Sequence, residues 1–140
     1  MINPIIVKLL EKRGITSREE MDEFLSDKPK KTYDPFLLPD MEAGVDLILA
    51  EIKAGSRICI YGDYDADGIT STALMMDVLR KLTTDDKLGY YIPSRFEEGY
   101  GLNMEAIKTI ADSGADFIIT VDCGSVSYEE ARYARELGMR

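Results

Sequence analysis

Three aspartates stand at alternate positions in the segment YGDYDADGIT, directly after the apolar stretch RICI. Asp63, Asp65 and Asp67 would repel one another at the end of a strand unless a cation offset their charges. A fourth carboxylate, Asp122, ends another apolar stretch in the segment TVDCGS. Carboxylate oxygens are hard ligands that select magnesium or manganese over softer metals. The four aspartates therefore predict a divalent-metal site if the two strand ends are neighbours.

Three other interpretations of the aspartate run are considered, and the second of them, an EF-hand loop, fails. An Asp- and Gly-rich turn between a strand and a helix can be a plain loop, in which Asp67 caps a helix that begins at Ile69. An EF-hand calcium loop would also begin as DYDADG, but the position where that loop needs a glutamate is Leu74. The segment DADGIT resembles the D-x-D-G-T signature of HAD-type phosphatases, although the further acidic pair of that site is missing after Asp122.

The composition narrows the chemistry further. The chain has 140 residues, a net charge of −9 and no histidine. The lack of histidine removes serine–histidine catalysis, histidine acid–base chemistry and most zinc sites. An acidic surface disfavours a broad electrostatic grip on nucleic acid, but it permits a nucleic-acid substrate that is bound through metal ions.

Neither a membrane span nor a disulfide framework is expected. No apolar run reaches the ~20 residues that cross a bilayer, and the N-terminus lacks the layout of a signal peptide, so a cytoplasmic location is expected. The two cysteines have no zinc spacing. We expect Cys59 in the core and Cys123 as a small buried residue.

Strands and helices alternate from residue 57 onward. RICIY, LGYYI and DFIITVD are typical of strands, and the segments ITSTALMMDVLRKL, NMEAIKTIADSG and SYEEARYARELG that follow them are typical of helices. Three such units with nearly continuous apolar strands predict an α/β fold, a parallel sheet with helices on both faces. We expect Asn103 to cap the second of these helices, and Ser127 with Glu130 to form a capping box on the third. In the first, the apolar stripe is expected at Ile69, Ala73, Met76 and Leu79.

The N-terminal part is predicted to be helical. One helix carries Ile5, Ile6, Leu9 and Leu10 and stops at Gly14, and a second opens with the capping box of Ser17 and Glu20. The polar segment SDKPKKTYDPF is typical of a connecting arm, and a third helix is expected from Asp40, as its N-cap, to Gly55. The predicted boundaries are 1–38 for the helical arm and linker and 39–140 for the α/β part. Because the last helix closes at Gly138, where a fourth strand is expected, we expect the chain to be a fragment.

The segments YGDYDADGITSTAL, PSRFEEGYGL and TVDCG together resemble the DHH phosphoesterase superfamily. Within it, the chain is most similar to the RecJ-like family of bacterial exonucleases, which degrade single-stranded DNA from 5′ to 3′ in repair and recombination. The segment YDPFLLPDME is similar to the part that leads into the catalytic core of that family. The resemblance covers roughly residues 33–138, with the motifs in the order of the family.

This resemblance implies a Rossmann-like domain that hydrolyses phosphodiesters with two manganese or magnesium ions. It makes Asp65, Asp67 and Asp122 the metal-binding and catalytic residues. Asp63 is implied to bind a metal or to lie beside the ligands. Gly62 and Gly68 would allow the backbone to run close to the ions, and the amides that open the following helix could face a substrate phosphate.

Besides Gly68, two further residues are candidates for substrate binding. Arg95 suits a phosphate contact, or alternatively a structural ion pair with Glu97 or Glu98. Tyr100 could stack on a base, but a position packed under the loop is favoured.

The Asp-His-His motif of the superfamily is absent, since the chain has no histidine. We therefore expect a fragment that is inactive alone and whose partners are single-stranded DNA and the missing C-terminal part of the same protein. The alternative is a DHH phosphoesterase of short oligonucleotides or cyclic dinucleotides. A binding module without enzymatic activity comes third.

Overall fold

The computed structural model describes residues 2–28 and 32–140. It divides into two compact units, Met1–Met41 and Glu42–Arg140, which are described separately. Among the described residues, no helix combines the length and the apolar character that a membrane span requires.

The described residues of the first unit form two short α-helices and a 3-10 turn. Helix α1 spans Pro4–Glu11, α2 spans Arg18–Phe24 and the turn η1 spans Pro35–Leu37. The predicted capping box on α2 is confirmed: Glu20 N donates to Ser17 Oγ over 3.1 Å, and Ser17 N donates to Glu20 Oε2 over 3.1 Å. Within the predicted connecting arm, residues 29–31 lie outside the described part of the chain.

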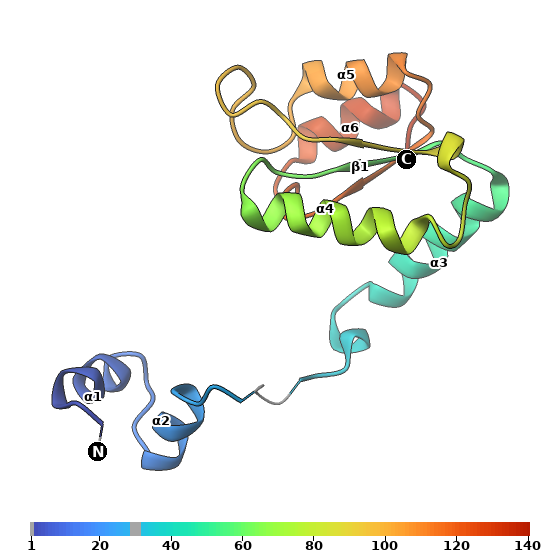
Figure 1. The fold of residues 1–140 in the computed structure, drawn as a ribbon. Coiled ribbons are helices and arrows are strands. Elements are labelled where there is room, and N and C mark those ends of the chain that lie inside the picture. Colours follow the sequence, from blue (N-terminus) through green and yellow to red (C-terminus); the bar gives the residue numbers. More distant parts are fainter. Residues whose placement is uncertain (1, 29–31) are drawn as a thin grey trace. The chain divides into compact units, whose positions relative to one another are not determined.

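The second unit is a three-stranded parallel sheet with helices on both faces, as predicted (Figure 1). Its elements are α3 (Met41–Ala54), β1 (Ile58–Tyr61), α4 (Ala66–Leu79), η2 (Asp85–Lys87), β2 (Leu88–Tyr91), α5 (Met104–Asp112), β3 (Phe117–Thr120) and α6 (Tyr128–Glu136). The strand order is β2-β1-β3, so β1 and β3 are neighbours. Ile58 lies opposite Leu88 on one side and Phe117 on the other.

The side chains of β1 alternate between the two layers of helices, as the period of two in a strand requires. Cys59 and Tyr61 pack against buried residues of α5 and α6, and Ile58 and Ile60 pack against α4 and α3. All four are buried. The central strand is therefore covered on both faces, which explains its unbroken apolar sequence.

Helix α4 begins three residues earlier than predicted, at Ala66 instead of Ile69. Its buried face consists of Gly68, Thr72, Met76 and Leu79, whereas Ile69 is 49% exposed. The predicted stripe is correct at Met76 and Leu79 and wrong at Ile69 and Ala73, because the prediction assumed that only apolar side chains face inward. The first two inward positions hold a glycine and a threonine, which let the helix start lie close to the end of β1.

Two other capping predictions need correction. Ser127 precedes α6, but its side chain makes no capping hydrogen bond. Asp40 precedes α3 with a φ of 60°, in the left-handed region. By contrast, Asn103 caps α5 as predicted, since its Oδ1 accepts from Ala106 N over 2.7 Å.

Candidate metal centre

Asp65 has a structural role in addition to its charge. It is the N-cap of α4, and its Oδ1 accepts hydrogen bonds from Asp67 N and Gly68 N, each over 3.0 Å. The next amide, Ile69 N, donates to the Asp65 carbonyl over 2.9 Å. The cap is therefore Asp65 and not Asp67, and these three amides already have protein acceptors.

Asp63 is the most buried member of the aspartate run, with 1% of its surface exposed. Its Oδ1 is buried and has no hydrogen-bond partner within the described part of the chain. Buried carboxylate oxygens are almost always paired with a donor or bound to a metal, because leaving one unpaired costs free energy. The described residues therefore leave this oxygen without the partner that a buried carboxylate oxygen needs.

Two glycines allow this loop to fold so tightly. A Cβ on Gly68 would lie 2.3 Å from the Asp63 carbonyl oxygen, and a Cβ on Gly62 would lie 2.0 Å from Thr72 Oγ1. Thr72 is buried and donates to the Gly68 carbonyl over 2.7 Å. The start of α4 is thus packed directly onto the backbone of Asp63, which fixes the position of that carboxylate.

Asp122 reaches the same place from β3. It follows the strand by two residues and has a φ of 59°, a left-handed conformation that aspartate adopts more readily than most residues. One carboxylate oxygen each of Asp63, Asp65 and Asp122 lies within 4.8 Å of the other two. We call these three residues the carboxylate cluster. The neighbouring positions of β1 and β3 therefore bring the two strand ends together.

Asp67 lies outside the carboxylate cluster, although the sequence placed it with Asp65 and Asp122. Asp122 is exposed, but the neighbouring atoms that displace water from its carboxylate raise its pKa, and the negative charges of Asp65, Asp67 and Asp63 raise it further. Asp67 is thus close enough to act on Asp122 through its charge. Sequence reasoning ranked Asp63 below Asp67, although its place directly after a buried strand was the available sign of its burial.

The two candidate substrate residues lie on the loop after β2. The guanidinium carbon of Arg95 lies 4.6 Å from the centre of the Tyr64 ring, a cation–π contact. Neither Glu97 nor Glu98 forms an ion pair with Arg95 among the described residues. Tyr100 is 70% exposed, so the favoured position under the loop is wrong.

An open groove of about 880 Å³ adjoins the cluster and is lined by both Tyr100 and Asp122. Cys123 also lines it, but burial raises the pKa of its thiol to about 11, with a further contribution from the charges of Asp63 and Asp122. A thiol with such a pKa stays protonated at neutral pH and is a poor nucleophile. The groove therefore offers a carboxylate and an exposed aromatic ring to a ligand.

Comparison with known proteins shows which proteins this chain is similar to. The model of the DHH family, N-terminal domain, matches residues 57–140. The single-stranded-DNA-specific exonuclease RecJ of Bacillus subtilis is 44% identical over 138 residues, which are 99% of this chain and 17% of that protein. The protein of the same name from Escherichia coli is 36% identical over 97% of this chain and 23% of its own length. The chain thus spans about a fifth of the curated relatives that it matches.

Solved structures show the same fold. A crystal structure of exonuclease RecJ bound to manganese matches 80% of this chain and 28% of that chain, with a TM-score of 0.68 and 34% identity. The structure of RecJ from Thermus thermophilus in complex with Mn²⁺ matches 94% of this chain and 17% of that chain, with a TM-score of 0.63 and 28% identity.

Proposed function

Since the chain belongs to the DHH family, we propose that its carboxylate cluster is the first part of the metal site of a phosphodiester hydrolase that acts on single-stranded DNA. The single observation that supports this most strongly is the buried Oδ1 of Asp63. It has no donor among the described residues, and its carboxylate faces those of Asp65 and Asp122 within 4.8 Å.

The residues fit a hard divalent cation. Three carboxylates and no histidine are an all-oxygen donor set, which suits manganese or magnesium. We propose Asp63, Asp65 and Asp122 as ligands, and Asp67 as the carboxylate that completes the catalytic set beside them. When bound, the metal ions would activate water and stabilise the charge that develops on the phosphate.

The chain's own residues would arrange the substrate. Arg95 is exposed, has no carboxylate partner among the described ion pairs and lies beside Tyr64, which separates Asp63 from Asp65 in the sequence. Tyr100 and Phe96, which are 70% and 94% exposed, offer rings on which unpaired bases can stack. Aromatic stacking and a fork-shaped cation suit a single strand better than a duplex, whose bases are already stacked.

The names of the relatives point to the same substrate, since RecJ of B. subtilis and of E. coli is a single-stranded-DNA-specific exonuclease. By this proposal the activity serves DNA repair and recombination in the cytoplasm. The ligands that complete the site would come from a segment that corresponds to the remaining length of the relatives. The 140 residues alone would then bind metal weakly and cleave little DNA.

Manganese binding to the 140-residue chain tests this proposal. We expect Asp63→Asn, Asp65→Asn and Asp122→Asn each to weaken Mn²⁺ binding at least tenfold, measured as the free Mn²⁺ signal in electron paramagnetic resonance titrations. Asparagine at position 65 can still cap α4, so a loss in that variant reports the charge and not the cap.

Asp46→Asn is the matched control, because Asp46 is exposed on α3 and the substitution removes the same charge. It is expected to leave the affinity for Mn²⁺ within about twofold of the unchanged chain. Equal affinities in all four variants would refute the metal site.

A further inference from the structure

The loop that follows β2 is tied to the sheet at both ends by side-chain hydrogen bonds. We call residues 93–102 the rim loop. At its start, Glu98 accepts from Ser94 N over 2.7 Å through Oε2 and from the Tyr91 hydroxyl over 2.6 Å through Oε1. At its end, the buried Tyr61 hydroxyl donates to the Gly101 carbonyl over 2.9 Å.

The two attachments are connected to each other. Asn103 Nδ2 lies 3.4 Å from the Tyr61 hydroxyl and 3.5 Å from Glu98 Oε1, while Asn103 Oδ1 caps α5. The rings of Tyr61 and Tyr91 stack with centres 5.5 Å apart. Glu98 therefore contacts the rim loop, β2 and the residue that caps α5. The hydrogen bond from Tyr91, followed by that from Ser94, lowers the pKa of Glu98.

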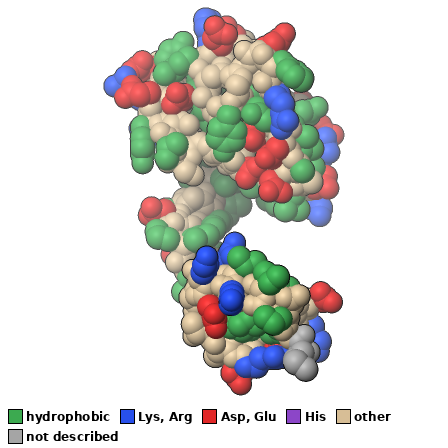
Figure 2. Space-filling model, turned by 90° about the vertical axis from the view of Figure 1, so that its left-hand side faces the viewer, with side chains coloured by type: hydrophobic (Ala, Val, Ile, Leu, Met, Phe, Trp, Pro, Cys, Tyr) green, Lys and Arg blue, Asp and Glu red, His purple; other side chains and the backbone are tan. Residues whose placement is uncertain are grey.

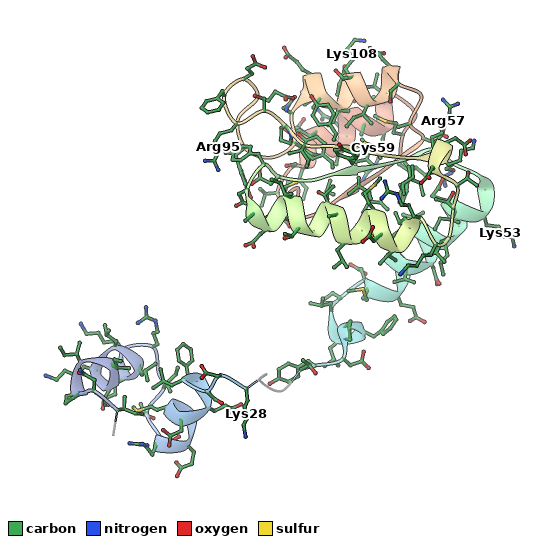
Figure 3. All side chains as sticks on the ribbon, in the orientation of Figure 1. Lys28, Lys53, Arg57, Cys59, Arg95 and Lys108 are labelled. Atoms are coloured by element: carbon green, nitrogen blue, oxygen red, sulfur yellow. The ribbon has the colours of Figure 1, made fainter. Side chains whose placement is uncertain are left out.

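Between these two attachments, several side chains of the rim loop are exposed, among them Arg95, Phe96 and Tyr100. Figure 3 shows Arg95 on this loop, at the end of the sheet where α4 begins. Its guanidinium stacks on Tyr64, which is the residue between Asp63 and Asp65. The Glu98 carboxylate accepts from its own donors on the rim loop and β2, and it does not pair with Arg95 among the described residues. The positive charge of Arg95 is therefore left for another anion.

We propose that Glu98 is a positioning residue that acts through Arg95. By fixing the rim loop to Tyr91 and Asn103, it holds the guanidinium of Arg95 against Tyr64, the residue between Asp63 and Asp65 in the sequence. A phosphate of a single-stranded oligonucleotide would then meet Arg95 at the edge of the metal site. This inference rests on the proposed function for the identity of the anion, and on the hydrogen bonds of Glu98 for the mechanism.

Glu98→Gln tests this role, with Glu97→Gln as the matched control. Glu97 is the exposed neighbour, and its substitution removes the same charge from the same loop. The probe is a 5′-phosphorylated oligothymidylate of about ten nucleotides, bound to the 140-residue chain with Mn²⁺ at low salt. We expect Glu98→Gln to weaken binding about tenfold and Glu97→Gln to stay within about twofold.

A double variant separates positioning from general stability. If Glu98 acts through Arg95, Glu98→Gln costs no further affinity once Arg95→Ala is present, whereas a role in stability alone would add to the loss. Tyr91→Phe removes one of the hydrogen bonds of Glu98 and keeps the stacked ring. If Glu98→Gln does not fold, Tyr91→Phe takes its place as the test. We expect Tyr91→Phe to weaken oligonucleotide binding as well, but by less than Glu98→Gln.

A measurement without DNA or metal distinguishes this inference from the proposed function. Nuclear Overhauser contacts between the Tyr64 ring and the Arg95 side chain should be present in the unchanged chain and in Glu97→Gln, and lost in Glu98→Gln or Tyr91→Phe. If these contacts depend on Glu98 but no variant binds the oligonucleotide, the positioning role holds and the proposed substrate is wrong. If the contacts and the affinity both survive in Glu98→Gln and Tyr91→Phe, the positioning role is wrong.

Discussion

At the scale of one residue, the Asp63 carboxylate offers the most direct test for a bound cation. It is buried, and its Oδ1 has no donor within the described part of the chain. Asparagine at this position keeps the shape, removes the charge and adds an amide that can donate to the carboxylate of Asp65 or Asp122. We therefore predict that in chelator Asp63→Asn raises the free energy of unfolding by about 1 kcal/mol. Thermal unfolding followed by circular dichroism measures the change.

Added manganese should reverse the order of stability. It should stabilise the unchanged chain more than Asp63→Asn. A ligand stabilises a protein in proportion to how tightly it binds the native state, and the variant lacks one of the proposed metal ligands. Asp46→Asn serves as the control and should respond to manganese as the unchanged chain does. A clear loss of stability for Asp63→Asn in chelator would mean that this carboxylate is structural.

Gly68 provides a second test at the scale of one residue. Its missing side chain is required because a Cβ would lie 2.3 Å from the Asp63 carbonyl oxygen, a backbone atom that cannot move aside cheaply. We predict that Gly68→Ala lowers the free energy of unfolding by at least about 2 kcal/mol and also weakens manganese binding. Gly89→Ala is the control, since nothing lies within 4 Å of its Cβ position, and it should change stability by less than about 0.5 kcal/mol. Equal effects of the two substitutions would contradict the close packing of α4 on this loop.

At the scale of elements, the junction between β2, the rim loop and α5 should respond to pH. The hydrogen bonds that Glu98 accepts from Tyr91 and Ser94 lower its pKa from its usual value of 4.5 in the folded state. A folded-state pKa below the unfolded one contributes stability above the unfolded value, and this contribution is lost as the pH falls through the folded value. We predict that the stability difference between the unchanged chain and Glu98→Gln is largest above about pH 5 and shrinks toward about pH 3.

Urea unfolding at a series of pH values measures this difference. Glu97→Gln is the control. Its stability difference from the unchanged chain should not follow the same dependence on pH, because the hydrogen bonds from Tyr91 and Ser94 go to Glu98 and not to Glu97. A stability difference for Glu98→Gln that stays constant from neutral to acidic pH would show that its carboxylate charge does not hold the junction together.

The elements themselves were largely predictable from the sequence, because each carries a strong local signal. Continuous apolar residues predicted the three strands, and glycines with positive φ, such as Gly55 and Gly138, marked the helix ends. The capping residues Ser17 and Asn103 also behave as predicted. The order of the strands was only a condition of the prediction. The structure places β3 beside β1, and because functional groups gather beyond neighbouring strand ends, this order brings Asp122 beside Asp65.

What the sequence did not predict depends on tertiary contacts between polar groups. The buried position of Asp63 follows from the packing of Gly68 on its backbone, and no periodic pattern reports such a contact. Glu51 is likewise buried on α3, where it accepts from Ser56 Oγ over 2.5 Å and pairs with Arg140 over 2.9 Å. The hydrogen bonds of Glu98 were missed for the same reason, because its partners Tyr91 and Asn103 lie on separate parts of the chain.

At the scale of the molecule, charge is the dominant feature. The chain has 26 acidic and 17 basic residues, a net charge of −9. On the face in Figure 2, acidic and basic side chains of the described residues lie interspersed, without a broad basic area. Under the proposed function, nucleic acid would therefore be attracted where cations are bound or where single groups such as Arg95 are exposed.

This excess of negative charge predicts the effect of salt on stability. The ion pairs among the described residues are mostly exposed, as in Arg18–Asp22 and Lys108–Asp112, and such pairs contribute little. Repulsion among the acidic groups should outweigh them, so sodium chloride should raise the melting temperature in chelator by screening that repulsion. The same salt should weaken manganese binding, because screening also reduces the attraction of a cation to the carboxylate cluster.

Asp46→Lys distinguishes net charge from a general effect of salt on proteins. It changes the net charge from −9 to −7 at an exposed position of α3 that is outside the carboxylate cluster. If repulsion across the molecule limits stability, the melting temperature of Asp46→Lys at low salt should be higher and should rise less when sodium chloride is added. A melting temperature that falls with salt in the unchanged chain would mean instead that the surface ion pairs outweigh the repulsion. In that case the acidic surface would act mainly on ligands, by attracting cations to the carboxylate cluster.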